Sequence, residues 1–244
     1  MNGGERQDAR APAGLELRGV TIALNGTTLV RGLSLVVAPG EVATVMGPSG
    51  SGKSSLLAYV CGTLASAFEA AGEIRVDGVE VSRLPVERRR VGILFQDDLL
   101  FPHLTVGENL LFAIPRRAAG RKARGELMRR ALAEAGLSGM EDRDPATLSG
   151  GQRARVALMR TLLARPRAVL LDEPFSKLDR TLKSAIRRFV FDHVRAEGLP
   201  TLLVTHDPED ARAAGGPVLH LGPALRSAPG APHAPAAPPE ECAP

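Results

Sequence analysis

The first third of the chain alternates short apolar runs with turn-forming residues. The pairs Asn25-Gly26, Pro39-Gly40 and Asp77-Gly78 separate runs that are rich in branched and other apolar residues. Such pairs favour tight turns, so this spacing predicts β-strands that follow one another closely. The expected strands are Leu15–Val20, Leu33–Val37, Val42–Val45 and Ile74–Val76.

The second half alternates buried-type strands with helical patterns. Strands are expected at Val91–Phe95, Ala168–Leu171, Thr201–Thr205 and, as the last ordered strand, Val218–Leu221. Apolar residues three or four apart predict a helix over residues 180–197. Apolar strands that alternate with helices predict an α/β fold with a parallel sheet covered on both faces.

A glycine-rich segment after the Val42–Val45 run carries the clearest chemistry. It fits the P-loop pattern G-x-x-x-x-G-K-[ST] and opens a predicted helix that extends to about residue 61. In this pattern backbone N–H groups cradle phosphates, the lysine pairs with the terminal phosphates and the hydroxyl residue ligates Mg²⁺. We therefore expect ATP and Mg²⁺ to bind here. The segment reads Gly47, Pro48, Ser49, Gly50, Ser51, Gly52, Lys53 and Ser54.

Two adjacent carboxylates follow the apolar run Val169–Leu171. Asp172 and Glu173 stand at the carboxyl end of a predicted strand, where neighbouring side chains point to opposite sides. Each can then do a different task, one at Mg²⁺ and one at the attacking water. The alternative is a pair of solvated acids, which the apolar run before them disfavours.

A Ser-Gly-Gly turn precedes the helical pattern of residues 153–163. By itself the turn predicts an N-cap, in which the serine accepts a free backbone N–H. The same geometry offers N–H groups and the positive end of a helix dipole to an anion. The turn and its neighbours are Leu148, Ser149, Gly150, Gly151 and Gln152.

With these motifs the chain resembles the nucleotide-binding subunit of an ABC (ATP-binding cassette) transporter, over about residues 15–221. The resemblance implies a P-loop NTPase of ABC type. Its mixed or parallel sheet core would carry an antiparallel β subdomain and an inserted α-helical subdomain at about residues 97–165. That domain would span residues 14–221, between a flexible N-terminus at 1–13 and a disordered, Pro/Ala-rich tail at 222–244.

The resemblance also assigns roles around one ATP molecule. Ser55 resembles the residue that touches the α-phosphate, and Asp172 the one that, with Ser54, steadies Mg²⁺. Glu173 would polarise the water, and His206 would hydrogen-bond the γ-phosphate. Gln96 matches the glutamine that touches Mg²⁺ or the water and reports nucleotide state to the helical subdomain.

Further motifs imply a second copy of the chain. In relatives the Ser-Gly-Gly segment binds the γ-phosphate held by the other subunit, which implies a head-to-tail homodimer around two ATP molecules. The acting residues would be Ser149, Gly150, Gly151 and Gln152. Ser176 to Asp179 resembles the D-loop that crosses the dimer interface, with Lys177 in place of the usual small residue.

The implied function is ATP hydrolysis that powers a transporter. The stretch Phe101–Asn109 is similar to importer subunits serving iron, thiamine or polyamines, and His103 within it is expected to be a surface or interface residue. The implied partners are two integral-membrane permease subunits and an extracytoplasmic solute-binding protein. The alternatives are an ABC ATPase acting on DNA or ribosomes, and a P-loop kinase or GTPase, which would leave residues 148–152 unexplained.

Composition narrows these alternatives. The net charge of +4 follows from a chain rich in Ala, Arg, Gly and Pro, without the aromatic-interleaved basic surface of nucleic-acid binders, so no nucleic acid is expected. No apolar run approaches the roughly 18–20 residues that cross a bilayer. The N-terminus lacks the apolar core of a secretory signal. We therefore expect a cytoplasmic protein, held peripherally on the inner face of the cell membrane through its permease.

Two departures from the family pattern affect these expectations. Relatives usually carry an aromatic residue just after the first strand, where it stacks on adenine. In this chain that position falls near Leu24, which is not aromatic. Tyr59, the single tyrosine, lies on the helix behind the P-loop. We expect modest ATP affinity and weak discrimination against GTP, because stacking on an aromatic ring is worth on the order of 1 kcal/mol. The chain also stops soon after residue 221, so no C-terminal substrate-binding regulatory domain is expected.

Overall fold

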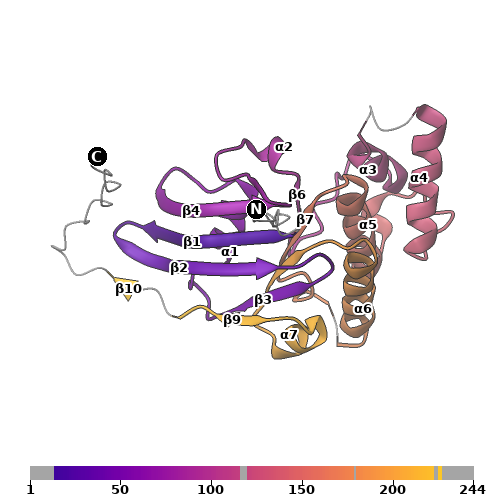
Figure 1. Cartoon of the computed structure of the whole chain (residues 1–244). Coiled ribbons are helices and arrows are strands. Elements are labelled where there is room, and N and C mark those ends of the chain that lie inside the picture. The colour runs from indigo at the N-terminus through magenta and orange to yellow at the C-terminus, as the bar shows by residue number, and fades with distance from the viewer. Residues whose placement is uncertain (1–13, 116–119, 179, 223–224, 227–244) are drawn as a thin grey trace, which may run out of the picture.

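The computed structural model describes residues 14–115, 120–178, 180–222 and 225–226. Its strands form two sheets, one antiparallel and one parallel, and a group of helices stands beyond the parallel sheet (Figure 1). The expected N-terminus at 1–13 and nearly all of the expected tail at 222–244 lie outside the described residues.

The antiparallel sheet is built from the first part of the chain and one late strand. Asn25 and Gly26 adopt φ of 48° and 71°, a left-handed pair that makes the tight hairpin predicted for this dipeptide. The strands on either side of it are longer than the expected runs, because sheet pairing continues through residues 21–24 and 27–32. In sheet order the strands are β10 (Leu225–Arg226), β2 (Thr27–Val37), β1 (Leu15–Leu24), β4 (Phe68–Val76) and β5 (Val79–Glu80).

The parallel sheet contains the buried-type strands that the sequence predicts. Its central strands are apolar along nearly their whole length, as expected for a sheet covered on both faces. In sheet order the strands are β6 (Val91–Leu94), β7 (Ala168–Asp172), β8 (Thr201–Val204), β3 (Val42–Met46) and β9 (Val218–His220).

The helices divide between the sheets and a separate cluster. One helix directly follows the P-loop, and its C-terminal carbonyls at Tyr59 and Val60 accept hydrogen bonds from the buried guanidinium of Arg89. Burial lowers the pKa of Arg89. The helices are α1 (Lys53–Cys61), α2 (Val86–Arg89), α3 (Val106–Ala113), α4 (Arg121–Glu134), α5 (Gly150–Leu163), α6 (Arg180–Ala196) and α7 (Pro208–Ala214), with a 3₁₀ turn at Pro145–Thr147.

The cluster of α3, α4 and α5 corresponds to the helical insertion expected at about residues 97–165. It has its own apolar core, which is formed by residues from all three helices, and α5 also packs against α6 (Figure 1). The side chain of Asn109 is buried, and its Nδ2 donates to the carbonyl oxygens of Phe101, Leu104 and Thr105. This amide therefore shapes the loop that enters α3.

One expectation about the end of the chain is wrong. The strand at Val218–His220 is followed by β10, whose residues Leu225 and Arg226 pair with Thr28 and Thr27 of β2. Ordered structure therefore extends beyond Leu221. Little in the sequence indicates this strand, because two residues carry no periodicity and backbone pairing at a sheet edge needs none.

Candidate nucleotide site

Four parallel strands end together at the site. Leu94 pairs with Leu171, Asp172 with Val204 and Val45 with Val204, so the carboxyl ends of β6, β7, β8 and β3 lie along one edge of the sheet. The segments that follow these strands carry Gln96, the Asp172–Glu173 pair, His206 and the P-loop. Sheet topology thus gathers chain segments that are far apart in the sequence, as is usual for ligand sites in open α/β sheets.

The P-loop has the backbone that its glycines permit. Gly50 and Gly52 adopt φ of 79° and 90°, a left-handed conformation that side chains disfavour. The ammonium group of Lys53 is buried and donates to the carbonyl oxygens of Gly47 and Pro48, each at 2.9 Å. The Ser51 hydroxyl is also buried, and no described residue hydrogen-bonds it. The loop therefore curls around its own lysine.

The two carboxylates do not continue one strand as expected. β7 ends at Asp172, and Glu173 adopts a left-handed φ of 46°, while its N–H donates to the Val204 carbonyl oxygen at 2.9 Å. The strand alternation argument therefore fails at Glu173. The sharp turn, rather than the pleat, separates the two carboxylates. A left-handed non-glycine residue is strained and such residues concentrate at functional sites.

Asp172 lies close to the P-loop helix. Burial and the nearby charge of Glu173 raise the pKa of Asp172, whereas a hydrogen bond from Ser54 and the charge of Lys53 oppose the rise. The carboxyl group thus sits between one acid and two P-loop residues.

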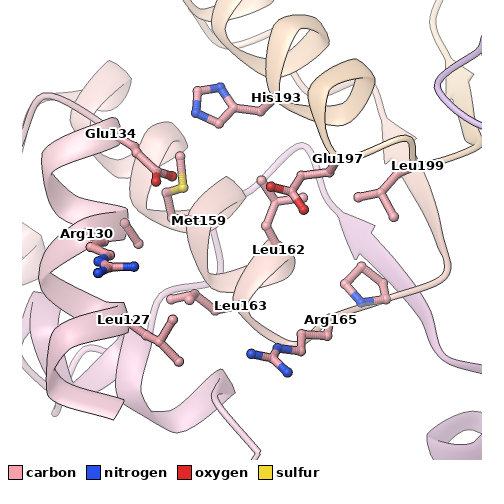
Figure 2. A pocket seen from close by; sticks show the side chains of 12 residues that line it. Leu127, Arg130, Glu134, Met159, Leu162, Leu163, Arg165, His193, Glu197 and Leu199 are labelled. Carbon is pink, nitrogen blue, oxygen red and sulfur yellow. The ribbon is translucent and has the colours of Figure 1, made fainter. Parts of the chain in front are cut away.

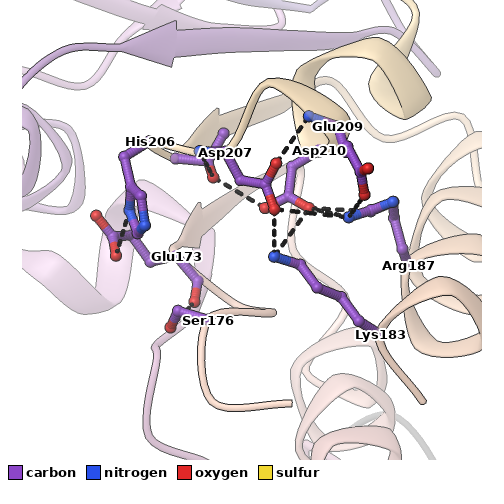
Figure 3. Close-up of polar contacts among 9 residues, drawn as sticks. Glu173, Ser176, Lys183, Arg187, His206, Asp207, Glu209 and Asp210 are labelled. Atoms are coloured by element: carbon purple, nitrogen blue, oxygen red, sulfur yellow. Dashed lines mark hydrogen bonds and ion pairs between the residues drawn. The ribbon is translucent and has the colours of Figure 1, made fainter. Parts of the chain in front are cut away.

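Glu173 also contacts the segment after β8. His206 Nδ1 lies 3.1 Å from Glu173 Oε2, and the two side chains are 64% and 24% exposed (Figure 3). Both side chains are therefore open to solvent on the side where a ligand would enter, and a water molecule or phosphate can reach them.

A buried network supports His206 from behind. Arg187 of α6 donates through Nε and Nη2 to Asp210 Oδ1, at 2.9 and 2.6 Å, and the Asp210 side chain is only 2% exposed (Figure 3). The Thr205 hydroxyl donates to Asp210 Oδ2 at 2.9 Å and accepts from the Asp207 N–H at 3.0 Å. The residues on either side of His206 are thus fixed through one hydroxyl group.

Asp207 is itself charge-paired. Burial alone would raise its pKa, but a hydrogen bond from Lys183 and one from the Glu209 N–H lower it. Asp207 also caps α7, because its side chain accepts from the Glu209 N–H.

The loop after β6 is tied to helix α5. Arg153 Nε donates to Asp98 Oδ2 at 3.2 Å, and Arg160 donates to the carbonyl oxygens of Leu99 and Asp98 at 2.7 and 3.2 Å. Burial raises the pKa of Asp98, and its bond to Arg153 opposes the rise. Gln96 itself is exposed. Any shift of this loop is therefore transmitted to α5.

The Ser-Gly-Gly segment begins α5 with the predicted cap. Ser149 Oγ accepts from the Gln152 N–H at 3.3 Å, and Gln152 Oε1 accepts from the Ser149 N–H at 2.8 Å, which forms a capping box. Ser149 is exposed, and Gly151 packs so tightly that an added Cβ would lie 2.6 Å from the Leu182 side chain.

Asp179 lies outside the described residues. Of the segment before it, Lys177 forms an ion pair with Asp97, next to Gln96. His103 is exposed, as expected for a surface residue.

Two cavities differ in their relation to these groups. One of about 460 Å³ is lined by Ser49, Gly50, Gly52, Lys53, Ser54, Ser55 and Glu173, together with Leu24, Leu29 and Phe68. A larger one of about 530 Å³ lies between α4, α5 and the end of α6 (Figure 2). None of the phosphate-binding candidates lines it. The chemistry therefore points to the smaller cavity.

Comparison with known proteins agrees with this geometry. The family model described as "ABC transporter" matches residues 30–176. YnjD of Escherichia coli K12, described as an uncharacterized ABC transporter ATP-binding protein, is 47% identical over 197 residues, which cover 81% of this chain and 90% of YnjD. The chain belongs to the ABC transporter family, as an ATP-binding and ATP-hydrolysing subunit.

Other relatives in this family are longer. The Fe(3+) ions import ATP-binding protein FbpC 3 of Rhodococcus jostii is 41% identical, over 84% of this chain but only 58% of its own length. The putrescine transport ATP-binding protein PotG of Escherichia coli K12 is 38% identical, over 83% of this chain and 53% of its own length. The chain thus spans little more than half of these relatives.

A solved structure shares the fold. The ATP-binding cassette MJ0796, in a dimeric post-hydrolysis state bound to ADP and Pi, superposes with a TM-score of 0.69 at 30% identity, over 85% of this chain and 94% of that one. The antiparallel subdomain, parallel sheet and helical subdomain predicted from the resemblance to ABC ATPases are thereby confirmed. Within the described residues, no helix is long and apolar enough to cross a membrane.

Some residues that line or support this candidate site belong to none of the sequence motifs. Phe68 lines the smaller cavity from the start of β4, and Arg187 with Asp210 forms the support behind His206. Asp98 connects the loop after β6 to α5. A faint signal existed for Asp210, an acid within a short helix after His206. Nothing in the sequence pattern pointed to Phe68.

Proposed function

We propose that the chain drives solute import by closing as a homodimer around two ATP molecules. The observation that carries the proposal is the contact of Glu173 with His206, at the edge of the cavity that the P-loop lines. A carboxylate and an imidazole at the γ-phosphate end are the groups that water activation requires. The iron import relative FbpC 3 supports import as the direction.

Within one subunit each group has a defined task. The P-loop backbone from Ser49 to Gly52 and the hydroxyl of Ser55 hold the phosphates, and Lys53 exchanges its carbonyl partners for phosphate oxygens. Glu173 orients the attacking water and takes its proton. His206, fixed by its neighbours, donates a hydrogen bond to the γ-phosphate.

The residues around Asp172 fit a magnesium ion. The Ser54 hydroxyl lies close enough to the Asp172 carboxylate to lower the pKa of Asp172, and Gln96 follows the strand beside them. Mg²⁺ commonly takes one or two protein oxygens and completes its shell with water and phosphates. When bound, it neutralises phosphate charge. Asp172 and Ser54 would hold it, with Gln96 approaching as the site closes.

The second subunit completes the site. The exposed Ser149 and the N-terminus of α5, with Gly150, Gly151 and Gln152, meet the γ-phosphate of the partner's ATP. From the resemblance to the D-loop, we assign the link between the two sites to Asp179. The dimeric state of MJ0796 supports this arrangement.

A surface beside the loop after β6 suits a permease. Phe95, Leu99 and Phe112 are exposed at 42, 55 and 69%. Phe112 lies edge-on to Phe101, with ring centroids 4.9 Å apart, and the Arg160 guanidinium lies over the Phe101 ring, 5.4 Å from its centroid. Because Arg160 also holds the loop, contact here would report the nucleotide state to a membrane partner. We propose two permease subunits and an extracytoplasmic solute-binding protein as partners, with the chain on the inner face of the membrane.

The test is Glu173→Gln. Loss of a positioned general base costs about 10²–10⁴-fold in rate, so ATP hydrolysis should fall at least about a hundredfold while ATP binding remains and the dimer persists. Hydrolysis and oligomeric state with ATP are the measurements, and Glu126→Gln, the same change at an exposed site on α4, is the control. Hydrolysis at the wild-type rate would refute the assignment of Glu173.

The same variant tests the partner. Purified from mild-detergent membranes with ATP, it should retain a multi-span membrane protein in stoichiometric amount, and Phe112→Ser should release that protein without changing ATP affinity. Recovery of ribosomes or DNA in its place would favour the non-transport alternative.

A further inference from the structure

The nucleotide cavity has a polar end and an apolar end. Its charged and hydroxyl groups are all P-loop residues or Glu173. Its remaining wall consists of three apolar side chains, Leu24, Leu29 and Phe68. A phosphate chain anchored at Lys53 directs the rest of a nucleotide toward this wall, because no other lining group is suited to an uncharged, flat ring.

Strand pairing brings Phe68 to the cavity. Phe68 begins β4, 44 residues beyond Leu24, yet the two are direct cross-strand partners in the β1–β4 pair. Directly opposed residues point to the same face of a sheet, so the Phe68 ring lies beside the Leu24 side chain. Figure 1 shows β1 and β4 side by side, with α1 behind them.

Neighbouring groups hold this wall against the P-loop. Phe68 is partly buried against the apolar core that the antiparallel sheet shares with α1 and the parallel sheet, and its N–H donates to the Ala65 carbonyl oxygen at 3.1 Å. Leu29 touches the loop so closely that a Cβ added to Gly52 would lie 2.8 Å from the Leu29 Cβ. The ring is therefore supported from behind and fixed relative to the phosphate-binding loop.

We infer that Phe68 is the surface on which the nucleobase stacks, in place of an aromatic residue at Leu24. Phe68 is the one aromatic side chain that lines this cavity among the described residues. Tyr59 does not serve, because its hydroxyl donates to the Gly72 carbonyl oxygen at 2.8 Å and its ring packs into the core. The inference rests on ATP binding, and not on the roles proposed for Glu173 or the permease.

The wall also predicts how bases are selected. Stacking on a phenyl ring favours any base, because every base has a π-face. Discrimination between adenine and guanine requires hydrogen bonds to the base edge, and the described side chains at the apolar end have none to offer. ATP and GTP should therefore bind with dissociation constants within tenfold of each other. Phe68 therefore restores the nucleotide affinity that is lost because Leu24 is not aromatic. The weak discrimination between ATP and GTP remains.

The first experiment measures the dissociation constants of ATP, GTP and tripolyphosphate by calorimetry. Phe68→Ala should weaken ATP and GTP about tenfold each, the size expected for an aromatic stacking contact, and leave tripolyphosphate unchanged. Phe68→Tyr should restore both nucleotides. Val79→Ala, at an exposed apolar side chain on β5, is the control and should change none of the three.

A second experiment reads the contact directly. The chain has no tryptophan, so Phe68→Trp places a single indole fluorophore at the wall. ATP and GTP should quench or shift its emission, and tripolyphosphate should not.

Three results would overturn the inference. One is Phe68→Ala with wild-type ATP affinity. Another is equal weakening of tripolyphosphate, which would show that Phe68 acts through the fold of the P-loop. The third is unchanged Phe68→Trp emission while calorimetry records ATP binding. ATP binding at least tenfold tighter than GTP would refute the base-tolerance part alone.

Discussion

The two ends of the nucleotide cavity are built by different means. The phosphate end is a run of consecutive residues, from Gly47 to Ser55, whose glycines and lysine shape one loop. The base end consists of Leu24, Leu29 and Phe68, which come from three strands and meet through pairing alone. A ligand that lacks a base touches only the first end, so tripolyphosphate and ATP together separate the two contributions.

The two ends of the cavity also differ in the parts of the structure that hold them in place. The phosphate end is completed by His206, whose neighbours are held by the buried Arg187–Asp210 pair. The base end rests on the apolar core that the antiparallel sheet shares with α1 and the parallel sheet. Substitutions at the first end should therefore affect every phosphate ligand, whereas those at the second should affect only nucleotides.

The largest effect is expected where that support is buried. Asp210→Ala leaves the Arg187 guanidinium, with a side chain 9% exposed, without its closest acceptor. Breaking such a buried pair costs about 3–5 kcal/mol of unfolding free energy. Denaturant unfolding measures it.

Glu209→Ala is the control for that experiment. Glu209 approaches the same guanidinium at 3.8 Å but is 67% exposed, so its removal should be nearly neutral. Equal losses in both variants would contradict the importance assigned to the buried pair.

The next effect in size comes from the phosphate end. Lys53→Met removes the buried ammonium while keeping a long side chain, and charge-assisted hydrogen bonds contribute about 1.5–3 kcal/mol each. ATP and tripolyphosphate should both lose on the order of a hundredfold in affinity. Lys122→Met on the exposed face of α4 serves as the reference. If Lys53→Met lost affinity for ATP and not for tripolyphosphate, the assignment of Lys53 to the phosphate end of the cavity would be refuted.

The smallest of the three tests the junction of the two ends. Gly52→Ala meets a φ of 90° and the Leu29 Cβ at 2.8 Å, so it should strain the loop and push the apolar wall outward. A left-handed alanine costs about 1–2 kcal/mol, which predicts roughly tenfold weaker ATP binding. Gly120→Ala, at φ −65° with open space around it, should be silent. If Gly52→Ala weakens tripolyphosphate binding and the nucleotide still changes the emission of Phe68→Trp, the strain is confined to the loop.

Much of the fold was predictable because its signals are local. The helix after the P-loop, the buried strands β7 and β8 and the capped start of α5 each follow from residue types within a few positions. The end of the chain was less predictable, because β10 pairs at an edge without periodicity. The strand alternation expected at Glu173 failed because a left-handed turn, which no nearby glycine announces, ends β7.

By itself the sequence determined the phosphate chemistry of this protein and its membership of the ABC family. Ser54, Asp172, Glu173 and His206 could be proposed in advance because motifs of short range specify the residue types at these positions. Only the tertiary structure decided that Phe68 stands opposite Leu24 and that Asp210 accepts a hydrogen bond from Thr205, the residue before His206. The physical reason is that strand register and helix packing depend on contacts across the whole sheet, so residues distant in the chain become neighbours without any local pattern that records it.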